Sequence, residues 1–192
     1  MNLMKNSYNP NNKLFRTIVL SGDIDENTVK ETIQTISYIN EIDGGKDEVE
    51  PIKLIINSLG GNILDGFALI GVIENSFVPV YTYGYGSIMS MALPVLVSGV
   101  KRFAHPLTTF MYHECLDVYG IYDKLSTIKE NLEETDRVMK MYDSYLISKT
   151  VLKQKQLDKI KNSRQDWYFN VNEAIRYNID RKSTRLNSSH RT

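Results

Sequence analysis

Apolar residues run along the first third of the chain in two different patterns. Leu14 to Leu20 combines β-branched, aromatic and long apolar side chains, which predicts a strand. The turn residues that follow lead into a predicted helix from about Glu26 to Tyr38. Ile52 to Asn57 is apolar at consecutive positions, which is typical of a strand covered on both faces. A parallel sheet with covering helices is therefore expected.

The order of strand, glycine turn and helix then recurs. Ser58 to Gly61 interrupts the second strand, and apolar residues at helical spacing predict a helix over residues 63–75. Val78 to Gly84 predicts a strand, and a largely buried helix is expected from Ser87 or Ser90 to residue 97. Two short strands are predicted at Lys101–Ala104 and Thr108–Tyr112. This alternation predicts an α/β fold whose parallel strands are joined by right-handed crossovers.

A longer helical pattern extends from Asp123 to about Lys149. Charged residues surround one apolar stripe, which consists of Leu125, Ile128, Leu132, Val138, Tyr142 and Tyr145. Such a stripe is buried against another surface, either of the same domain or of a neighbouring subunit. A short helix near Gln154–Asn162, a strand near Trp167–Phe169 and a helix start at Asn172 are expected after it.

Composition narrows the class of protein. The 192 residues are 42% apolar and 24% charged, which fits one globular domain. Cys115 is the only cysteine in the sequence, so no internal disulfide is expected. The first residues lack the hydrophobic segment of a secretory signal and no long apolar span follows, so a cytoplasmic protein without membrane contact is expected.

The last residues differ in character from the rest of the chain. The stretch DRKSTRLNSSH, from Asp180 to His190, resembles the translation of a common sequencing adapter. We therefore expect residues 180–192 to be a non-native tail, the alternative being a short polar tail. Without them, acidic residues outnumber basic ones by three, which does not favour a nucleic-acid partner.

Two turns between a strand and a helix carry candidate chemistry. Gly60 and Gly61 allow positive φ and close backbone approach, and free N–H groups at the next helix start favour a developing negative charge. In the second turn, Ser87 or Ser90 is either a helix cap or a nucleophile, with the N–H of Met91 stabilising the oxyanion.

A nucleophilic serine needs a base and an orienting acid. His113 ends a predicted strand and would emerge at the same edge of the sheet, whereas His105 precedes a proline in a predicted turn. Asp166, just before a predicted strand, is one candidate among many acids. Cys115 is more typical of a small buried residue than of a nucleophile, and no second histidine completes a zinc-binding helix, so no metal is expected.

Four ordered blocks of sequence resemble the proteolytic subunit of the Clp protease family. They are INSLGGNILDGFAL, YGYGSIMSMALPVLVSG, KRFAHPLTTFMYHE and QDWYFNVNEAIRYNID, within about Arg16 to Ile179. The resemblance implies a ClpP/crotonase-like α/β core of repeated β-β-α units in a spiral with a protruding handle helix. It also implies that residues 116–149 form the handle region and that residues 1–15 belong to an axial entrance.

The resemblance implies a role for each matching residue. Ser90 would be the nucleophile, His113 the base and Asp166 the acid that orients it. The oxyanion hole would consist of the Gly61 and Met91 N–H groups. The substrate would bind beside Gly60, Val118, Tyr119 and Gly120.

Several positions depart from the family pattern. Leu59 replaces the proline of the glycine turn, which makes that turn less rigid. Ile88 and Met89 stand where two alanines are usual, Ala92 stands where a glycine is common, and Glu114-Cys115 replaces Gln-Pro. We expect an active protein, with a pocket that the larger side chains crowd or reshape.

The function implied is that of a serine endopeptidase subunit that cleaves unfolded polypeptides. The resemblance implies two stacked heptameric rings fed by an AAA+ unfoldase, and since the chain has no Walker loop, ATP use belongs to that partner and no cofactor is expected here. Three alternatives stay open: a non-catalytic ring subunit, a viral capsid-maturation relative and a crotonase-like acyl-CoA enzyme.

Overall fold

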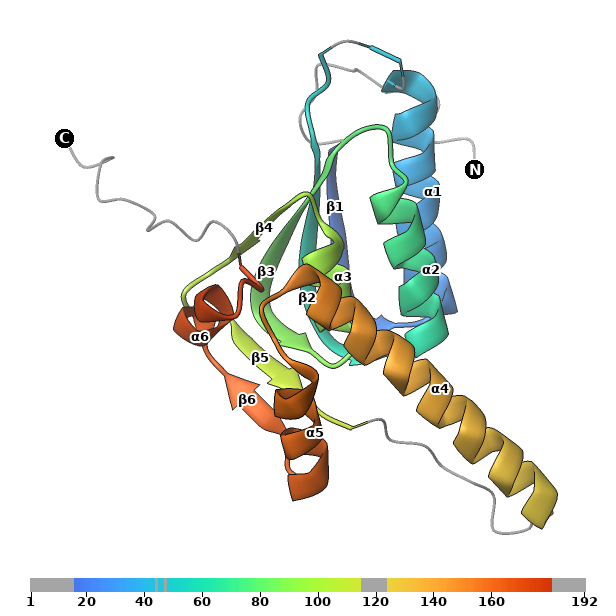
Figure 1. The fold of residues 1–192 in the computed structure, drawn as a ribbon. Coiled ribbons are helices and arrows are strands. Elements are labelled where there is room, and N and C mark those ends of the chain that lie inside the picture. The colour runs from blue at the N-terminus through green and yellow to red at the C-terminus, as the bar shows by residue number, and fades with distance from the viewer. Residues whose placement is uncertain (1–15, 44, 47, 115–123, 181–192) are drawn as a thin grey trace.

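A mixed sheet with helices packed against it forms the body of the protein (Figure 1). The computed structural model describes residues 16–43, 45–46, 48–114 and 124–180. The strands are β1 (Thr17–Ile24), β2 (Ile52–Gly61), β3 (Val80–Met89), β4 (Lys101–Ala104), β5 (Thr109–Tyr112) and β6 (Trp167–Phe169). The helices are α1 (Glu26–Asp43), α2 (Ile63–Glu74), α3 (Ala92–Ser98), α4 (Leu125–Lys149), α5 (Gln154–Ser163) and α6 (Val171–Arg176).

The strands lie in the order β1-β2-β3-β5-β6, and β4 also pairs with β3. Every described pairing is parallel except that of β5 with β6, which is antiparallel. The predicted α/β fold with parallel strands is therefore confirmed. Consequently β2, β3 and β5 end at the same edge of the sheet, and the segments that follow them meet there.

The first three strands are longer than the sequence pattern predicts. The turn residues after Leu20 continue β1 to Ile24, and the glycines 60 and 61 belong to β2. Similarly, β3 extends through Met89, so the helix expected from Ser87 or Ser90 begins only at Ala92. Pairing with a neighbouring strand decides these ends, because backbone hydrogen bonds across the sheet outweigh the local turn preference.

The core between sheet and helices is built from β-branched and long aliphatic side chains. Ile52, Leu54 and Ile56 of β2 are fully buried, but Lys53 and Asn57 are exposed and Ile55 is only half-buried. The prediction of a strand covered on both faces is therefore wrong for the described chain, because the helices cover β2 on one face only. Every residue of α3 is also buried, including Pro94 and Ser98. Because α3 is enclosed, the turn that enters it is held firmly in place.

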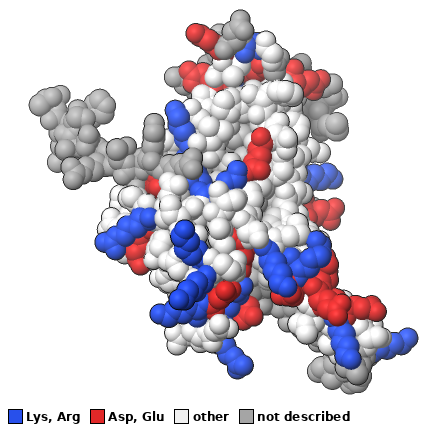
Figure 2. All heavy atoms as spheres, in the orientation of Figure 1, with Lys and Arg blue, Asp and Glu red and all other residues white. Residues whose placement is uncertain are grey.

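The long helix α4 divides into two halves. Its C-terminal half buries Val138, Met139, Tyr142 and Leu146 against the body, whereas Leu132 in the other half is 57% exposed. In Figure 1 this N-terminal half extends away from the sheet. Side chains of both charge signs lie along it in Figure 2, and the ion pair of Asp136 and Lys140 lies where the two halves meet. The predicted stripe therefore packs on its own domain only in its C-terminal half.

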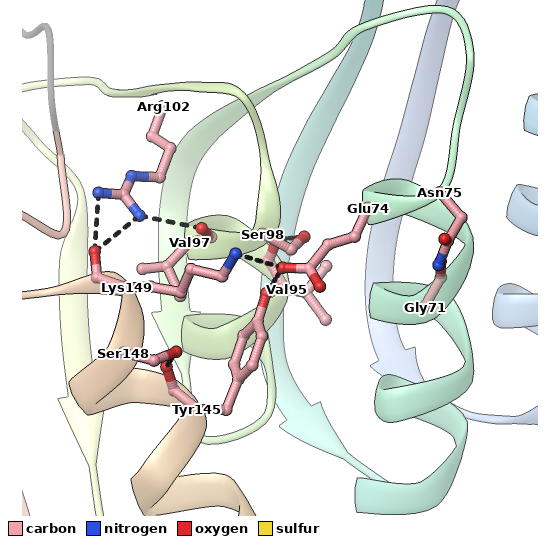
Figure 3. A network of polar contacts seen from close by, with 10 residues as sticks. All are labelled: Gly71, Glu74, Asn75, Val95, Val97, Ser98, Arg102, Tyr145, Ser148 and Lys149. Carbon is pink, nitrogen blue, oxygen red and sulfur yellow. Dashed lines mark hydrogen bonds and ion pairs between the residues drawn. The ribbon is translucent and has the colours of Figure 1, made fainter.

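A polar network holds the C-terminal end of α4 against α2, α3 and β4 (Figure 3). The buried Arg102 guanidinium donates to the carbonyls of Val97 at the end of α3 and Lys149 at the end of α4. The Tyr145 hydroxyl donates to Glu74 of α2 at 2.6 Å, and the Lys149 ammonium forms an ion pair with the same carboxylate. The contacts of Arg102 stabilise both helix C-termini by satisfying carbonyls that have no partner within their own helix.

The last described residue, Asp180, belongs to the packed body. It is 2% exposed, and its carboxylate accepts a hydrogen bond from the Ala104 N–H at 3.2 Å. The rest of the expected tail, residues 181–192, lies outside the described residues, as does the expected entrance segment over residues 1–15.

Candidate active site

Ser90 lies in a tight turn directly after β3. Its φ of 49° falls in the left-handed region, which few residues other than glycine adopt. The surrounding chain maintains this conformation, because the Ser90 N–H donates to the Met111 carbonyl at 2.9 Å and the Ser90 carbonyl accepts from the Leu93 N–H at 3.0 Å. Strained residues of this kind are concentrated at functional sites.

Neither serine of this segment caps the helix. The residue before α3 is Met91, and no side chain there accepts a capping hydrogen bond. Ser87 lies within β3, where its N–H donates to the Asn57 side chain at 3.0 Å. The capping interpretation is therefore wrong, and of the two serines Ser90 is the one whose hydroxyl contacts a histidine.

His113 follows β5 and faces the serine. Its Nε2 atom lies 2.8 Å from the Ser90 Oγ, across 23 positions of sequence. The parallel pairing of Met89 with Met111 brings the two segments together. His105 has a different place, because its Nδ1 accepts the Leu107 N–H at 3.2 Å within a turn. The base expected for a nucleophilic serine is thus in hydrogen-bonding reach.

Asp166 lies beside this pair without a bond to it. The antiparallel register ends with the pair Tyr112 and Trp167, and His113 and Asp166 are the residues directly beyond that pair on the two strands. The Asp166 side chain is exposed and forms no hydrogen bond or ion pair with any other residue that the structure describes. The structure brings the serine and the histidine together, and the aspartate into their neighbourhood only.

The glycine turn lies against the serine turn. Gly60 and Gly61 have φ values of 108° and 146°, which a side chain would strain. A β-carbon at Gly61 would meet the Ile24 carbonyl oxygen at 2.3 Å. The Met91 N–H has no acceptor among the residues of the described ranges, as expected for the first N–H group at a helix start.

A cavity of about 250 Å³ opens at this junction. Its lining consists of Leu59, Gly61, Ile63, Ser90, His113, Met139 and Tyr142. Neither Ile88 nor Met89 lines it, and the buried Ile88 side chain lies against Gly84 instead. The expected crowding by these two larger residues is therefore not seen in this cavity, and for Ile88 the reason is that its side chain belongs to the core.

Two lining residues come from α4 and were not expected from the sequence. Met139 and Tyr142 are buried, and the Tyr142 hydroxyl donates to the Ser90 carbonyl at 2.9 Å. Tyr142 belongs to the predicted apolar stripe, so its burial was foreseeable. Its contact with the serine turn was not, since it depends on how α4 docks against α3.

The buried carboxylate of Asp143 is bonded to the residue that precedes His113. Asp143 accepts hydrogen bonds from the Tyr112 hydroxyl at 2.7 Å and from the Lys161 ammonium at 2.6 Å. Burial, together with the Asp143 carboxylate, raises the pKa of Tyr112. Burial alone would lower the pKa of Lys161, but the bond to Asp143 raises it overall. This cluster joins α4, α5 and the residue that precedes His113.

Other expected features have a simpler outcome. Val118, Tyr119 and Gly120 lie outside the described residues, as does Cys115. Within the described ranges, no three or more His, Cys, Asp or Glu side chains are grouped so as to hold a metal ion. In the same ranges, every helix is too short or too polar to cross a membrane.

These features place the protein in the class of α/β proteins that carry a serine–histidine pair where the parallel strands of the sheet end. The model of the Clp protease family matches residues 4–181. The chain belongs to this family, as the resemblance of its sequence blocks implied.

Curated relatives and a solved structure agree with this membership. The chain is 25% identical to the ATP-dependent Clp protease proteolytic subunit 2 of Treponema denticola, over 85% of this chain and 79% of that protein. It is 29% identical to the ATP-dependent Clp protease proteolytic subunit of Porphyromonas gingivalis, over 85% of this chain and 71% of that protein. A mutant of ClpP1 from Listeria monocytogenes superimposes with a TM-score of 0.75, covering 88% of this chain and 92% of that one at 23% identity. The ClpP-like fold is thereby confirmed.

Proposed function

We propose that this protein is a serine endopeptidase, the proteolytic subunit of a Clp-type protease. The contact of the Ser90 Oγ with the His113 Nε2 at 2.8 Å carries the proposal. The cavity beside it and the Met91 N–H, which has no acceptor within the described ranges, support the same chemistry. Asp166 acts as the orienting acid once its exposed carboxylate turns toward the Nδ1 atom of His113.

The reaction follows from these groups. His113 Nε2 takes the proton of Ser90 as the Oγ atom bonds to the peptide carbonyl carbon, and the oxygen of that carbonyl becomes the oxyanion. The N–H groups of Gly61 and Met91 stabilise that charge. His113 then returns the proton to the leaving amine as the C–N bond breaks. Water cleaves the acyl-serine by the same route and releases the acid.

The assembly belongs to the same proposal. We infer a homo-oligomer of two stacked heptameric rings, with the exposed half of α4 at the junction of the rings. An AAA+ ATPase would deliver unfolded polypeptides and hydrolyse ATP, so this chain needs no cofactor of its own. A cytoplasmic location is part of this inference.

Labelling with a fluorophosphonate tests the chemistry directly. Mass spectrometry of the labelled protein is expected to find the adduct on Ser90, and cleavage of casein or a short fluorogenic peptide should disappear in Ser90→Ala. Ser87→Ala is the matched control, because its side chain lies outside the cavity, and it should keep both reactions.

The alternatives predict other results. A folded wild-type protein that is neither labelled nor cleaves peptides, alone or with an ATPase partner, would be a non-catalytic ring subunit or a capsid-maturation relative. Turnover of an acyl-CoA thioester without serine labelling would indicate a crotonase-like enzyme.

A further inference from the structure

The peptide group between Ser90 and Met91 contacts two segments that are far apart in the sequence. Its oxygen accepts hydrogen bonds from the Leu93 N–H at 3.0 Å and from the Tyr142 hydroxyl at 2.9 Å. Its N–H belongs to Met91 and donates to no acceptor within the described part of the chain. In this single peptide group, the carbonyl oxygen of Ser90 is therefore fixed by hydrogen bonds, while the N–H of Met91 is available to donate one.

Planarity connects these two ends. In a trans peptide the C=O and N–H bonds point in opposite directions, so a contact that fixes the carbonyl also fixes the direction of the N–H. A carbonyl that accepts hydrogen bonds also polarises its peptide group, which strengthens the N–H as a donor. Both effects favour a developing oxyanion on the N–H side.

We propose that Tyr142 is a positioning residue, which aims and strengthens the Met91 N–H as an oxyanion donor by holding the Ser90 carbonyl. This inference rests on the proposed peptidase function. The contact of Leu93 is local and moves together with the turn. Tyr142 lies 52 positions away on α4, so it fixes the turn relative to a separate element.

The surroundings of Tyr142 suit this role. Its side chain is 3% exposed, and burial, followed by the charge of Asp143, raises its pKa, so the hydroxyl stays protonated and donates. Its ring packs at 47° to that of Tyr112 with 5.9 Å between centroids. The end of α4 is itself held by Arg102, which donates to the Lys149 carbonyl, and by the ion pair of Lys149 with Glu74 (Figure 3). The hydroxyl is thus presented from a fixed helix.

The substitution Tyr142→Phe removes the hydroxyl and keeps the ring. With a fluorogenic peptide and the assembled full-length protein, kcat should fall about tenfold, since complete loss of one oxyanion donor costs on the order of 100- to 1000-fold. KM should stay within about twofold of the wild type, because the ground-state carbonyl gains little from the donor.

Two inhibitors separate positioning from substrate binding. A peptide aldehyde forms a hemiacetal whose oxygen occupies the oxyanion site, and it should bind about tenfold more weakly to the variant. The matching peptide alcohol forms no such oxygen and should bind equally well. The ratio of the two affinities is independent of how much of the variant is folded.

Tyr145→Phe is the matched control. It removes a hydroxyl from the same helix that bonds Glu74 at 2.6 Å, far from Ser90 in the hydrogen-bond network. Its kcat and inhibitor ratio should equal those of the wild type, because the contacts of Arg102 and the ion pair of Lys149 with Glu74 still hold the end of α4.

Equal kcat and an unchanged inhibitor ratio in Tyr142→Phe would overturn the proposal while leaving the peptidase function intact. A parallel loss of aldehyde and alcohol affinity would also overturn it, because Tyr142 would then act on substrate binding. A wild-type protein that a fluorophosphonate does not label would instead remove the proposed function itself.

Discussion

A β-carbon at Gly60 would lie 2.6 Å from the β-carbon of Ser90. It would also approach the Met91 nitrogen and the Met89 carbonyl oxygen at 3.0 Å each. The glycine turn and the serine turn therefore pack backbone against backbone, and the candidate site requires a residue without a side chain at position 60.

Gly60→Ala should disable the site. The added methyl group displaces Ser90 or its neighbours, and the φ of 108° is itself unfavourable for alanine. We expect peptide cleavage and fluorophosphonate labelling to fall at least about 100-fold, since small displacements of reacting groups are that costly. The free energy of unfolding should fall by about 1–3 kcal/mol.

Gly71→Ala is the control for that substitution. Gly71 lies on the exposed side of α2, and a β-carbon there meets nothing within 4 Å. Alanine favours a helix over glycine by about 0.5–1 kcal/mol, so this variant should melt slightly higher and keep full activity. Normal activity of Gly60→Ala would show that the two turns are not closely packed in the working protein.

The orienting acid can be identified by comparing two exposed carboxylates near His113. Asp166→Asn should lower kcat by on the order of 10³- to 10⁴-fold at neutral pH, because the imidazole loses the partner that fixes its tautomer. Glu114→Gln, next to the histidine in sequence, should change kcat less than about threefold. Steady-state hydrolysis of a fluorogenic peptide measures both. The opposite ranking would assign the role to Glu114.

The buried ion pair of Asp143 and Lys161 should contribute to stability. The Asp143 side chain is 1% exposed, so Lys161→Met leaves a buried carboxylate without its cation and should cost about 3–5 kcal/mol in the free energy of unfolding. Urea denaturation measures the loss. Lys140→Met removes the exposed pair with Asp136 and should cost about 0.5 kcal/mol or less. Equal losses would mean that solvent reaches Asp143.

The stability of the protein should decrease in acid partly through Asp43. Burial alone would raise the pKa of this carboxyl, but the hydrogen bond from Lys46 and the charge of Arg16 lower it overall. A lowered pKa in the folded state means that ionised Asp43 stabilises the protein above the unfolded pKa of about 3.9. This contribution is lost as the pH falls below about 4.

Asp43→Asn tests this dependence. The variant should be less stable than the wild type by about 1–2 kcal/mol at pH 7, and the difference should shrink as the pH approaches 3. Denaturation at several pH values measures it, with Asp136→Asn as an exposed control that leaves the profile unchanged. A difference that stays constant between pH 7 and pH 3 would exclude titration of Asp43 as its cause.

The sequence predicted the order of the elements and the proximity of Ser90 and His113. Apolar residues at Ile52–Asn57 correctly indicated a strand, although only one of its faces is covered. His113 was expected at the same sheet edge as Ser90 because His113 ends a predicted strand and Ser90 lies in a turn after another one. Such patterns succeed because strand burial and glycine turns depend on residues close together in the chain. The family blocks added the choice of Ser90 over Ser87.

Only the tertiary structure decided the contacts between distant residues. The extension of β3 to Met89 excluded the capping role, and the docking of α4 placed the Tyr142 hydroxyl on the Ser90 carbonyl. Those outcomes depend on strand register and on the angle at which one helix meets another, which involve many residues at once. Local sequence therefore determined which groups reach the sheet edge, while packing determined how these groups face one another.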